Sequence, residues 1–535
     1  MSRTQDKTTG NLPAVAGDRL PRLPEGWCSA LLGDIADITS GITKGQRHRR
    51  GTELREVPYL RVANVQRGFL DLEAITFIAA TEDKIQALRL QVGDVLFTEG
   101  GDRDKLGRGW VWSGEIEECI HQNHIFRARL LSPDINPKFV SYHGNSFGQD
   151  WFLRNGKQTT NLASINQSVL RRFPVPIPPS KEQRRIVAKI EELFSDLDAG
   201  VAALERAKAN LKRYRAAVLK AAVEGKLTEK WRADNPAKEP ASKLLERILT
   251  ERRRKWEEQQ LAKYAAKGKQ PPANWKSKYK EPVGPDESKL PGLPEGWCWA
   301  TVGQVGEAVT GNTPSKTNPD FFGDDVLFVK PTDLNAGYYV SDSAEKLSGS
   351  GASVARVLPR LCVLVTCIGA TIGKTGLNRV ECATNQQINA LMPVADYVLS
   401  TWLFWLFVSP FGQQTIKARA SATTLPILNK GKFEKLPVPI PPADEQNAAV
   451  EILENCLSIV DEAEAQIEAN QKRSSRLRQS ILKRAFEGKL VPQDPTDEPA
   501  EVLLGRIVRE RTPDVPKRKG AYNARKAKQS KRARP

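Results

Sequence analysis

The stretch Gly369–Thr375 contains the residue types of a phosphate-binding loop, two glycines followed by a lysine and a threonine. Such a loop needs four residues between its glycines, because the backbone N–H groups of that span surround the phosphates. Only three residues separate Gly369 from Gly373, and Ile368 stands where the first glycine is needed. The spacing argues against a nucleotide site and favours a strand that runs into a turn, with Lys374 near the surface.

Cys119, His121 and His124 are close enough in sequence to suggest a metal site. A structural zinc site uses four such ligands, and no fourth is apparent nearby. The chain repeats itself, as described below, and the second copy has Thr384 and Gln387 in place of the two histidines. We therefore expect no shared metal site.

Signatures of covalent catalysis are missing from the sequence. It has four histidines and no H-E-x-x-H, G-x-S-x-G or protein-kinase pattern. It also lacks the Asn-Pro-Pro-aromatic or Asp-Pro-Pro-aromatic tetrapeptide with which DNA amino-methyltransferases hold an extruded base, and an acidic cluster for nuclease metals. The sequence therefore predicts a binding protein with no catalytic residues, no metal and no cofactor of its own.

The charge of the chain favours a polyanionic partner. Its 81 Lys and Arg against 63 Asp and Glu give a net charge of +18, which suits nucleic acid or an anionic membrane face. The densest apolar run, Trp402–Val408, is far shorter than the roughly 20 residues that span a bilayer, so we expect a buried helix there and no membrane segment. Seven cysteines without a C-x-x-C pair, and an N-terminus without an apolar signal core, favour the cytoplasm.

Short blocks of sequence recur in the same order along the chain. Leu23–Cys28 returns as Leu293–Cys298, and Pro174–Pro179 returns as Pro437–Pro442. The blocks Glu182-Gln183, Glu224–Leu227 and Glu239–Ala241 return as Glu445-Gln446, Glu487–Leu490 and Glu498–Ala500. One unit of roughly 230 residues is therefore used twice, which is far too long a repeat for a solenoid.

Both copies have the same predicted order of elements. A globular half with short β-like runs, such as Tyr59–Val62, Val95–Thr98 and Val363–Thr366, comes first. A proline-rich hinge follows, because proline continues neither a helix nor a ladder. A long helix then spans about 181–223 in the first copy and 444–486 in the second. Ser180 and Gln183 have capping-box spacing at the start of the first of these helices.

Heptad stripes on both helices predict a coiled coil. About 43 residues at about 1.5 Å each give about 64 Å, longer than a small domain is wide, so an intramolecular antiparallel pair is favoured over packing on one core. Ser474 interrupts the second stripe. The predicted seam residues are Ile190, Leu197, Leu204, Leu211 and Val218 in the first helix and Leu453, Val460, Ile467 and Ile481 in the second, with Ile186, Leu193, Ala207 and Tyr214 at the other seam position of the first helix.

These blocks closely resemble the specificity subunit of type I restriction–modification systems. The resemblance rests on the Leu-Pro-Glu-Gly-Trp opening, the Pro-Ile-Pro-Pro hinge followed by Glu-Gln, and the helix that ends in Glu-Gly-Lys-Leu, each present twice, and it covers about 23–504. Gly100–Arg108 and Gly369–Lys374 look like the family's glycine-turn segments. Gln122–Ile125 and Asn385–Ile388 look like the strands that follow them.

The resemblance implies a mixed α+β fold, in which two α/β target-recognition domains alternate with two long helices that form an intramolecular antiparallel coiled coil. Each domain would read one half of a bipartite site on double-stranded DNA, and the helices would set the spacer. The chain would be a non-catalytic, cytoplasmic subunit that binds no cofactor. Two modification subunits would bring the S-adenosylmethionine site for adenine methylation, and restriction subunits would use ATP and Mg²⁺.

This interpretation divides the chain into seven segments. They are a flexible N-terminus (1–22), a first target-recognition domain (23–179), a first helical spacer region (180–250), a basic linker (251–290), a second target-recognition domain (291–442), a second helical spacer region (443–510) and a disordered basic tail (511–535). Tails of this kind contact phosphates without reading bases.

Candidate DNA contacts are the cationic and amide side chains near the glycine turns and strand ends, since Lys and Arg bind phosphates and Arg, Lys, Asn and Gln bind base edges. They are Arg61, Asn64, Arg103, Lys105, Arg108, Gln122, Asn123, Lys157 and Thr159 in the first domain, and Lys330, Asp333, Lys374, Asn385, Gln386, Gln387, Lys417 and Arg419 in the second. Two other interpretations stay open: a coiled-coil scaffold or adaptor that binds nucleic acid without sequence preference, and a methyltransferase with an unrecognised catalytic domain.

Overall fold

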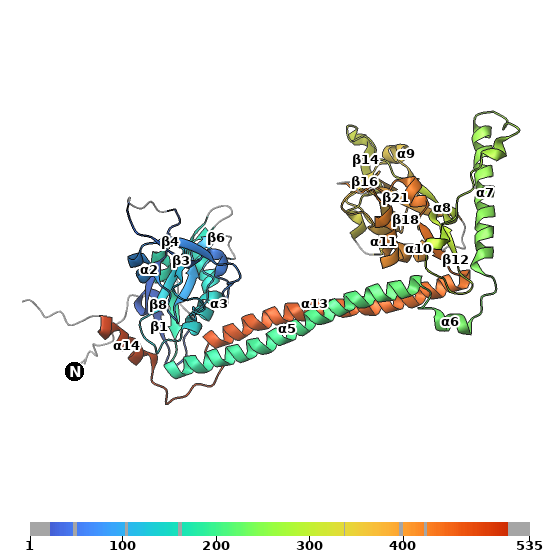
Figure 1. The fold of residues 1–535 in the computed structure, drawn as a ribbon. Coiled ribbons are helices and arrows are strands. Elements are labelled where there is room, and N and C mark those ends of the chain that lie inside the picture. The colour runs from blue at the N-terminus through green and yellow to red at the C-terminus, as the bar shows by residue number, and fades with distance from the viewer. Residues whose placement is uncertain are drawn as a thin grey trace, which may run out of the picture. The chain divides into compact units, whose positions relative to one another are not determined.

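The computed structural model describes residues 22–45, 51–101, 105–158, 163–335, 338–394, 400–421 and 425–511. The chain divides into two compact units, one formed by residues 1–203 with 470–535 and the other by residues 204–469. Each unit contains a globular domain and a part of each long helix (Figure 1). Among the predicted contacts and segments, the N-terminus up to residue 21, Arg103, Thr159 and the tail from residue 512 lie outside the described residues.

The first domain packs small sheets and short helices around an apolar core that includes Leu32, Phe97, Phe152 and Phe173. Its described strands form four sheets, in the orders β1-β11, β2-β8-β5, β4-β3-β7 and β6-β10-β9. The bounds are β1 Cys28–Leu31, α1 Leu32–Ile35, β2 Ala36–Ser40, β3 Arg55–Leu60, β4 Thr76–Ala80, α2 Glu82–Leu88, β5 Val95–Thr98, β6 Gly100–Gly101, β7 Ile120–His121, β8 Ile125–Leu130, α3 Pro137–Asn155, β9 Lys157–Gln158, β10 Ala163–Ser164, α4 Gln167–Arg171, β11 Pro174–Ile177 and, from the end of the chain, α14 Ala500–Arg511.

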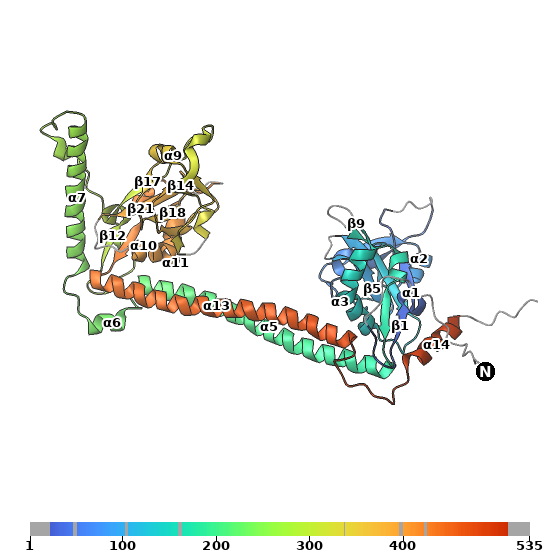
Figure 2. The same ribbon diagram turned by 180° about the vertical axis from the view of Figure 1, so that it is seen from behind.

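The second domain also combines sheets with short helices, and its two larger sheets have more strands than those of the first domain (Figure 2). Its described strands are ordered β12-β22, β13-β21-β18-β19-β15 and β16-β14-β20-β17. The bounds are α6 Glu229–Asp234, α7 Ala241–Ala266, β12 Cys298–Thr301, α8 Val302–Val305, β13 Gly306–Thr310, β14 Phe322–Val329, β15 Tyr339–Val340, β16 Glu345–Leu347, α9 Gly349–Val354, β17 Val357–Leu358, β18 Val363–Thr366, β19 Thr375–Asn378, β20 Cys382–Thr384, β21 Ile388–Pro393, α10 Ser400–Val408, α11 Pro410–Arg419, α12 Lys430–Glu434 and β22 Pro437–Ile440.

Two sequence predictions about apolar runs hold in these domains. Val95–Thr98 and Val363–Thr366 are the strands β5 and β18, whereas β3 ends at Leu60 and leaves Arg61 and Val62 beyond it. The run at Trp402–Val408 lies in α10, where Trp402, Leu403 and Phe407 are buried, as predicted. None of the helices in the described part of the chain is long and apolar enough to cross a membrane.

The long helices are α5, Ser180–Val223, and α13, Ala443–Phe486, so both predicted ranges are correct to within one residue. Each begins directly after the proline hinge, because proline is not tolerated in the interior of a helix. Each ends before a glycine in the left-handed region, Gly225 with φ +68° and Gly488 with φ +66°. Glycine adopts this conformation without strain and commonly stops helices in this way.

Within each unit, α5 and α13 pack side by side in opposite directions. In the first unit, Ile186 and Ile190 pack in one apolar cluster with Ala485, and Asp198 forms an ion pair with Arg478. In the second unit, the apolar cluster contains Val218, Leu219, Ala222, Leu453 and Leu457, while Lys208 lies 3.5 Å from Glu468 and Arg215 pairs with Asp461. Residue numbers fall along α13 as they rise along α5, which defines an antiparallel pair in both units.

The first predicted stripe is buried or half-buried along its length, and of the second seam position Ile186 is buried, Leu193 and Ala207 are half-buried, and Tyr214 was wrongly placed. Ile190, Val218, Leu453, Val460 and Ile467 are buried, whereas Leu197, Leu204, Leu211 and Ile481 are half-buried. Tyr214, placed in the seam by the sequence, is 51% exposed. Phe194 and Arg215 contact residues of α13 instead, through Arg478 and Glu464.

Candidate nucleic-acid interface

The repeated sequence blocks meet where each domain joins the helices. Trp27 Nε1 donates to Glu182 Oε2 at 3.1 Å in the first unit, and Trp297 Nε1 donates to Glu445 Oε2 at 2.9 Å in the second. The tryptophan comes from the opening block and the glutamate from the first turns of the long helix. The most visible repeats in the sequence are therefore structural, and they fix the joint between domain and helix.

Gln183 takes part in this joint and not in the predicted capping box. Its Nε2 donates to the Pro178 carbonyl at 2.9 Å, and its Oε1 accepts from the Asn136 N–H at 2.8 Å. Gln446 Nε2 donates to the Pro441 carbonyl in the same way, at 2.9 Å. The amide thus ties the proline hinge to the helix, a long-range role that local spacing could not distinguish from a cap.

Each joint also combines the two copies of the repeat. Gly488 from the second copy lies against the opening block of the first, where an added Cβ would lie 2.4 Å from Pro24 Cγ. The Ala500 N–H donates to the Gly26 carbonyl at 3.0 Å, and α14 then buries Leu503 and Ile507 in the first domain's core. The tail of one copy therefore completes the domain of the other.

The same exchange builds the joint of the second domain. An added Cβ at Gly225 would lie 2.4 Å from Pro294 Cγ. The Ala241 N–H donates to the Gly296 carbonyl at 2.8 Å, and α7 buries Leu244 in the second domain's core. A side chain at either glycine would force the opening block away from the helix end.

The predicted contact residues of the first domain gather at the end of two parallel strands. β3 and β7 pair in parallel, with Leu60 opposite His121, so Arg61 and Gln122 leave the sheet at the same edge. Arg108 Nη2 donates to the Val62 carbonyl at 3.2 Å, and the Val62 N–H donates to Gln122 Oε1 at 3.4 Å. The first strand edge is defined as Arg61, Asn64, Arg108, Gln122 and Asn123.

The second domain repeats this edge. β14 and β20 pair in parallel, with Val329 opposite Thr384, so Lys330 and Asn385 leave the sheet together. Gln386 Oε1 accepts from Thr313 Oγ1 at 2.6 Å, and Asn385 Nδ2 donates to Gln387 Oε1 at 2.9 Å. The second strand edge is defined as Lys330, Asp333, Asn385, Gln386 and Gln387.

A short turn holds the cation at each edge. The Arg61 N–H donates to Asn64 Oδ1 at 2.8 Å, before the 3₁₀ turn Val62–Asn64, and the Lys330 N–H donates to Asp333 Oδ2 at 2.7 Å, before the turn Asp333–Asn335. Asn64 is 3% exposed and also donates to the Asp71 and Ala74 carbonyls. Asn64 and Asp333 thus shape the turns in this structure, and both are among the candidate DNA contacts from the sequence.

The exposed side of the edges is formed by fewer residues than the sequence suggested. Gln386 is exposed, and Arg61 and Gln122 are half-buried. Lys330 forms an ion pair with Glu345 and lies 5.5 Å from the Phe328 ring centroid. Lys330 lowers the pKa of Glu345, first through their hydrogen bond. Arg61 Nε is buried and has no hydrogen-bond partner among the described residues.

One pair beside the first edge escaped sequence analysis. Glu99 Oε2 lies 2.5 Å from His124 Nδ1, and the backbone N–H of Glu99 donates to the His124 carbonyl at 2.8 Å. This pair joins the end of β5 to the strand edge. His124 was weighed in the sequence only as a metal ligand, and no local pattern brings residues 99 and 124 together.

The remaining predicted residues lie on the glycine turns and their neighbours. Lys105 follows the first turn, and Lys157 is exposed in β9, which pairs with β10 beside the turn strand β6. Lys417 is exposed on α11, while Arg419 Nη1 donates to the Lys435 carbonyl. These residues stay predicted contacts.

The backbone N–H groups of the turn before Lys374 bond within the protein, that of Gly369 to the Pro426 carbonyl at 3.0 Å and that of Gly373 to the Thr366 carbonyl at 2.9 Å. Gln413 Nε2, from α11, donates to the Gly373 carbonyl at 2.7 Å, and an added Cβ at Gly373 would lie 2.5 Å from Gln413 Oε1. A phosphate cradle needs backbone N–H groups that face an open ligand. The segment is a covered strand-to-turn connection between β18 and β19, as the spacing predicted.

Cys119 and His121 belong to the core. Burial raises the pKa of the Cys119 thiol to about 12, and burial lowers the pKa of His121 to about 4. His121 Nδ1 lies 2.9 Å from the Ile125 carbonyl. Across the residues that the structure describes, no three His, Cys, Asp or Glu side chains are grouped as a metal site.

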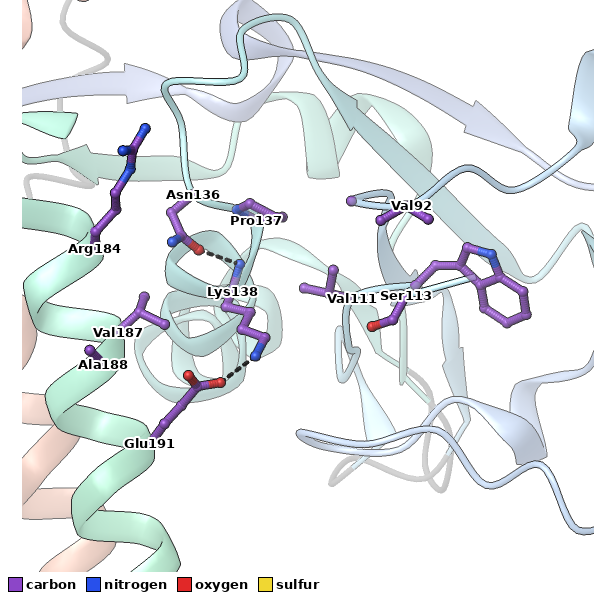
Figure 3. Close-up of a pocket in the computed structure, with 12 residues that line it drawn as sticks. Val92, Val111, Ser113, Asn136, Pro137, Lys138, Arg184, Val187, Ala188 and Glu191 are labelled. Atoms are coloured by element: carbon purple, nitrogen blue, oxygen red, sulfur yellow. Dashed lines mark hydrogen bonds and ion pairs between the residues drawn. The ribbon is translucent and has the colours of Figure 1, made fainter. Parts of the chain in front are cut away.

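A groove of about 450 Å³ lies beside α5 in the first unit and is separate from the strand edge (Figure 3). Val92 and Val111 line one side, and Val187 and Glu191 of α5 line another. Lys138, from the start of α3, forms an ion pair with Glu191 across it. No predicted contact residue lines this groove, so it belongs to the helix side of the domain.

The sequence matches the family described as type I restriction modification DNA specificity domain twice, over residues 24–207 and 294–470. The two matches fall on the two domains, each with the first part of the long helix that follows it. The chain therefore belongs to this family of DNA specificity domains.

The curated relatives that the chain matches are specificity subunits of type I restriction enzymes. The chain is 29% identical over 205 residues to the specificity subunit of type I restriction enzyme EcoKI from Escherichia coli (strain K12), covering 36% of this chain and 43% of that protein. It is 25% identical over 500 residues to the EcoBI specificity subunit of Escherichia coli, covering 91% and 93%. The chain spans about half the length of the first curated relatives it matches.

A solved structure shares the fold. It is reported under the description "Structural basis underlying complex assembly and conformational transition of the type I R-M system", with a TM-score of 0.59 and 19% identity, and the match covers 88% of this chain and all of that one. The mixed α and β fold with long helices is thus common to both chains.

Proposed function

We propose that this chain is the non-catalytic, DNA-reading subunit of a type I restriction–modification enzyme. Each strand edge reads one half of a bipartite site on double-stranded DNA. The helices α5 and α13 form one continuous antiparallel coiled coil that sets the unread spacer between the halves. The observation that carries the proposal is the recurrence of one edge, a cation and amide side chains at the ends of two parallel strands, in both specificity domains.

The chemistry of the edges suits base reading. Arg and Lys bind the acceptors of guanine, and Asn and Gln bind adenine through paired donor and acceptor groups. The two edges differ in composition, Arg61 and Gln122 against Lys330 and Asn385. Two different half-sites follow from this difference, because each edge presents its own set of donors and acceptors.

Methylation and cleavage belong to partner subunits in this proposal. Two modification subunits bind S-adenosylmethionine, and restriction subunits use ATP and Mg²⁺, while this chain holds none of these groups. The covered turn at Gly373 supports this division for nucleotides. Calorimetry of the pure chain should give no S-adenosylmethionine binding, and stoichiometric binding would point to an unrecognised methyltransferase.

The decisive test is to map methylated adenines in a host that expresses the chain with its modification subunits. The expected result is one bipartite motif with a fixed spacer, absent when the chain is omitted. Methylation at one continuous motif would contradict the two-edge proposal. Methylation without any motif would favour a scaffold that binds nucleic acid without sequence preference.

A further inference from the structure

The helix α7 extends well beyond the turns that pack on its domain. It has 26 residues, and its counterpart α14 is described over Ala500–Arg511. Both pack their first turns on a domain core, through Leu244 and Ile248 in α7 and through Leu503 and Ile507 in α14. α7 then continues through the predicted linker boundary at residue 250, and the chain returns along it towards the second domain (Figure 1). We name residues 251–281 the basic arm; they lie outside both family matches.

Each acidic residue of the basic arm forms an ion pair with a cation of the same arm. Glu251 lies 2.6 Å from Arg254, Glu258 lies 2.5 Å from Arg254, and Glu257 lies 3.0 Å from Lys276. Glu281 lies 3.7 Å from Arg253. The arm contains 10 Lys and Arg against these 4 Glu, a net charge of +6. The ion pairs therefore leave a large uncompensated positive charge.

That charge is carried by five exposed lysines, which have no ion-pair partner among the described residues. Arg252 and Lys255, by contrast, donate to the Gly306 and Val394 carbonyls and attach the arm's base to the second domain. We name the five the arm lysines: Lys263, Lys267, Lys269, Lys278 and Lys280. Exposed like charges repel one another, so their grouping favours an anionic partner.

An aromatic cluster fixes the returning segment of the arm. The Trp256 ring centroid lies 6.0 Å from that of Trp275, with the rings nearly parallel, and 5.2 Å from that of Tyr279. Arg253 lies 5.7 Å from the Tyr279 centroid. The bond from Thr301 Oγ1 to the Val283 carbonyl, at 2.9 Å, then ties the chain to the domain. The returning segment, with Lys278 and Lys280, is thus packed against α7.

The second domain itself carries little net charge. Residues 291–442 contain 12 Lys and Arg against 11 Asp and Glu, a net +1. Contacts of cations with phosphates supply most of the sequence-independent affinity for DNA. The domain's own charge cannot supply much of it, and the nearest source in the same unit is the basic arm.

We propose that the basic arm binds the phosphate backbone of double-stranded DNA flanking the half-site read by the second domain. This inference rests on the proposed function. The arm reads no bases, because lysine ammonium groups on phosphates position a protein without selecting sequence. It therefore raises affinity for every DNA sequence alike, and it lengthens the protected DNA on one flank of the site.

The test compares two five-lysine variants, each in complex with the modification subunits. The arm variant replaces the arm lysines by Gln. The control variant carries Lys220→Gln, Lys226→Gln, Lys230→Gln, Lys238→Gln and Lys243→Gln, five exposed lysines of the same unit outside the arm. Binding is measured against salt concentration on duplexes with the mapped site, with a long flank or with the flank removed directly after the second domain's half-site, and on a duplex without the site.

We expect the arm variant to bind both long duplexes about tenfold more weakly, with the preference for the site unchanged. The slope of log affinity against log salt should flatten by about 0.9 for each phosphate that the arm no longer neutralises. On the truncated duplex the arm variant and the unchanged chain should bind alike. The control variant should keep the affinity and slope of the unchanged chain on every duplex.

Equally weakened binding in both variants, or unchanged binding of the arm variant to the long duplex, would overturn the inference. It would also be overturned if the arm variant failed to assemble with the modification subunits while its salt slope stayed the same, because the arm would then bind protein. If the unchanged complex showed no preference for any site, the proposed function would fail. A flattened salt slope in the arm variant alone would still support the arm as a DNA contact.

Discussion

The two joint glutamates show how one sequence motif acquires different electrostatics in its two copies. Glu445 Oε1 accepts from Thr228 Oγ1 at 2.6 Å and lies 2.9 Å from Arg232. Glu182 Oε1 is buried without a hydrogen-bond partner in the described structure. Burial is the largest effect on Glu182 and raises its pKa above the ordinary value. The equivalent residues therefore contribute differently to stability, although both accept a tryptophan N–H.

Substitution of the two glutamates should separate these roles. Glu445→Gln removes the charge that faces Arg232 and should lower the free energy of unfolding by about 2 kcal/mol, as for a hydrogen bond to a charged group. Glu182→Gln keeps an acceptor for Trp27 and removes a poorly compensated buried charge, so the decrease should stay below about 1 kcal/mol. Denaturant unfolding followed by tryptophan fluorescence gives both values, and equal decreases would contradict the assigned difference.

The raised pKa of Glu182 also predicts a pH dependence. The folded chain binds this proton more tightly than the unfolded chain, so protonation favours the fold at pH below the raised pKa. This contribution is lost as the pH rises from the ordinary value through the raised one. The stability difference between the unchanged chain and Glu182→Gln should therefore vary with pH in this window. A constant difference across mildly acidic pH would show that Glu182 is not perturbed.

At the strand edges, Arg61 and Lys330 occupy equivalent places and allow a paired experiment. Arg61→Ala should relax base preference at one half-site by about 1–3 kcal/mol and leave the other half-site unchanged. Lys330→Ala should do the reverse. Methylation mapping of both variants, assembled with the modification subunits, measures the two half-sites together. Loss of methylation at all sites without any change of motif would assign these residues to phosphate contact or folding.

At the scale of elements, local signals predicted the helices well and the sheets less well. The hinge prolines and the glycines at 225 and 488 define the ends of α5 and α13, so both ranges followed from sequence. The parallel pairing of β3 with β7 joins residues about 60 positions apart, and no local pattern encodes it. Arg61 became a candidate from a β-like run and Gln122 from a segment that resembles a family strand, but the sequence did not show that the two lie together or that Asn64 is 3% exposed.

Ser474 gives a test of the helix pair. It follows the stripe of Leu453, Val460 and Ile467, is 8% exposed, and its hydroxyl has no partner among the described residues. Ser474→Leu should extend the apolar seam and raise the free energy of unfolding by about 1 kcal/mol. Ser475→Leu, at the exposed neighbouring position, is the control and should give no increase. Equal effects of the two substitutions would show that the stripe does not face α5 at this point.

At the scale of the whole molecule, each copy of the repeat supplies elements that complete the domain of the other copy. The end of the second copy, through Gly488 and α14, completes the first domain, and the end of the first copy, through Gly225 and α7, completes the second. Both domains therefore depend on both long helices for their joints. Each joint lies within one unit, so a change in helix length between the joints should leave both joints and the folds of both domains intact.

This dependence leads to a test of the helices as a spacer ruler. Tandem duplication of the seven residues 204–210 in α5 and of the seven residues 465–471 in α13 lengthens both helices around the Lys208–Glu468 pair. Seven residues keep the heptad in register and add about 10.5 Å. DNA advances about 3.4 Å per base pair, so the spacer in the methylated motif should grow by about three base pairs. Both half-sites should stay the same, because neither strand edge is altered.

The control duplicates residues 204–210 in α5 alone. The added turns then have no partner in α13, so the seam is interrupted and the preference for any single spacer should be abolished or weakened. Adenine methylation mapping measures the spacer for the unchanged chain, the paired duplication and the single duplication. An unchanged spacer in the paired duplication, with normal half-sites, would show that the distance between half-sites is set by the modification subunits instead of by α5 and α13.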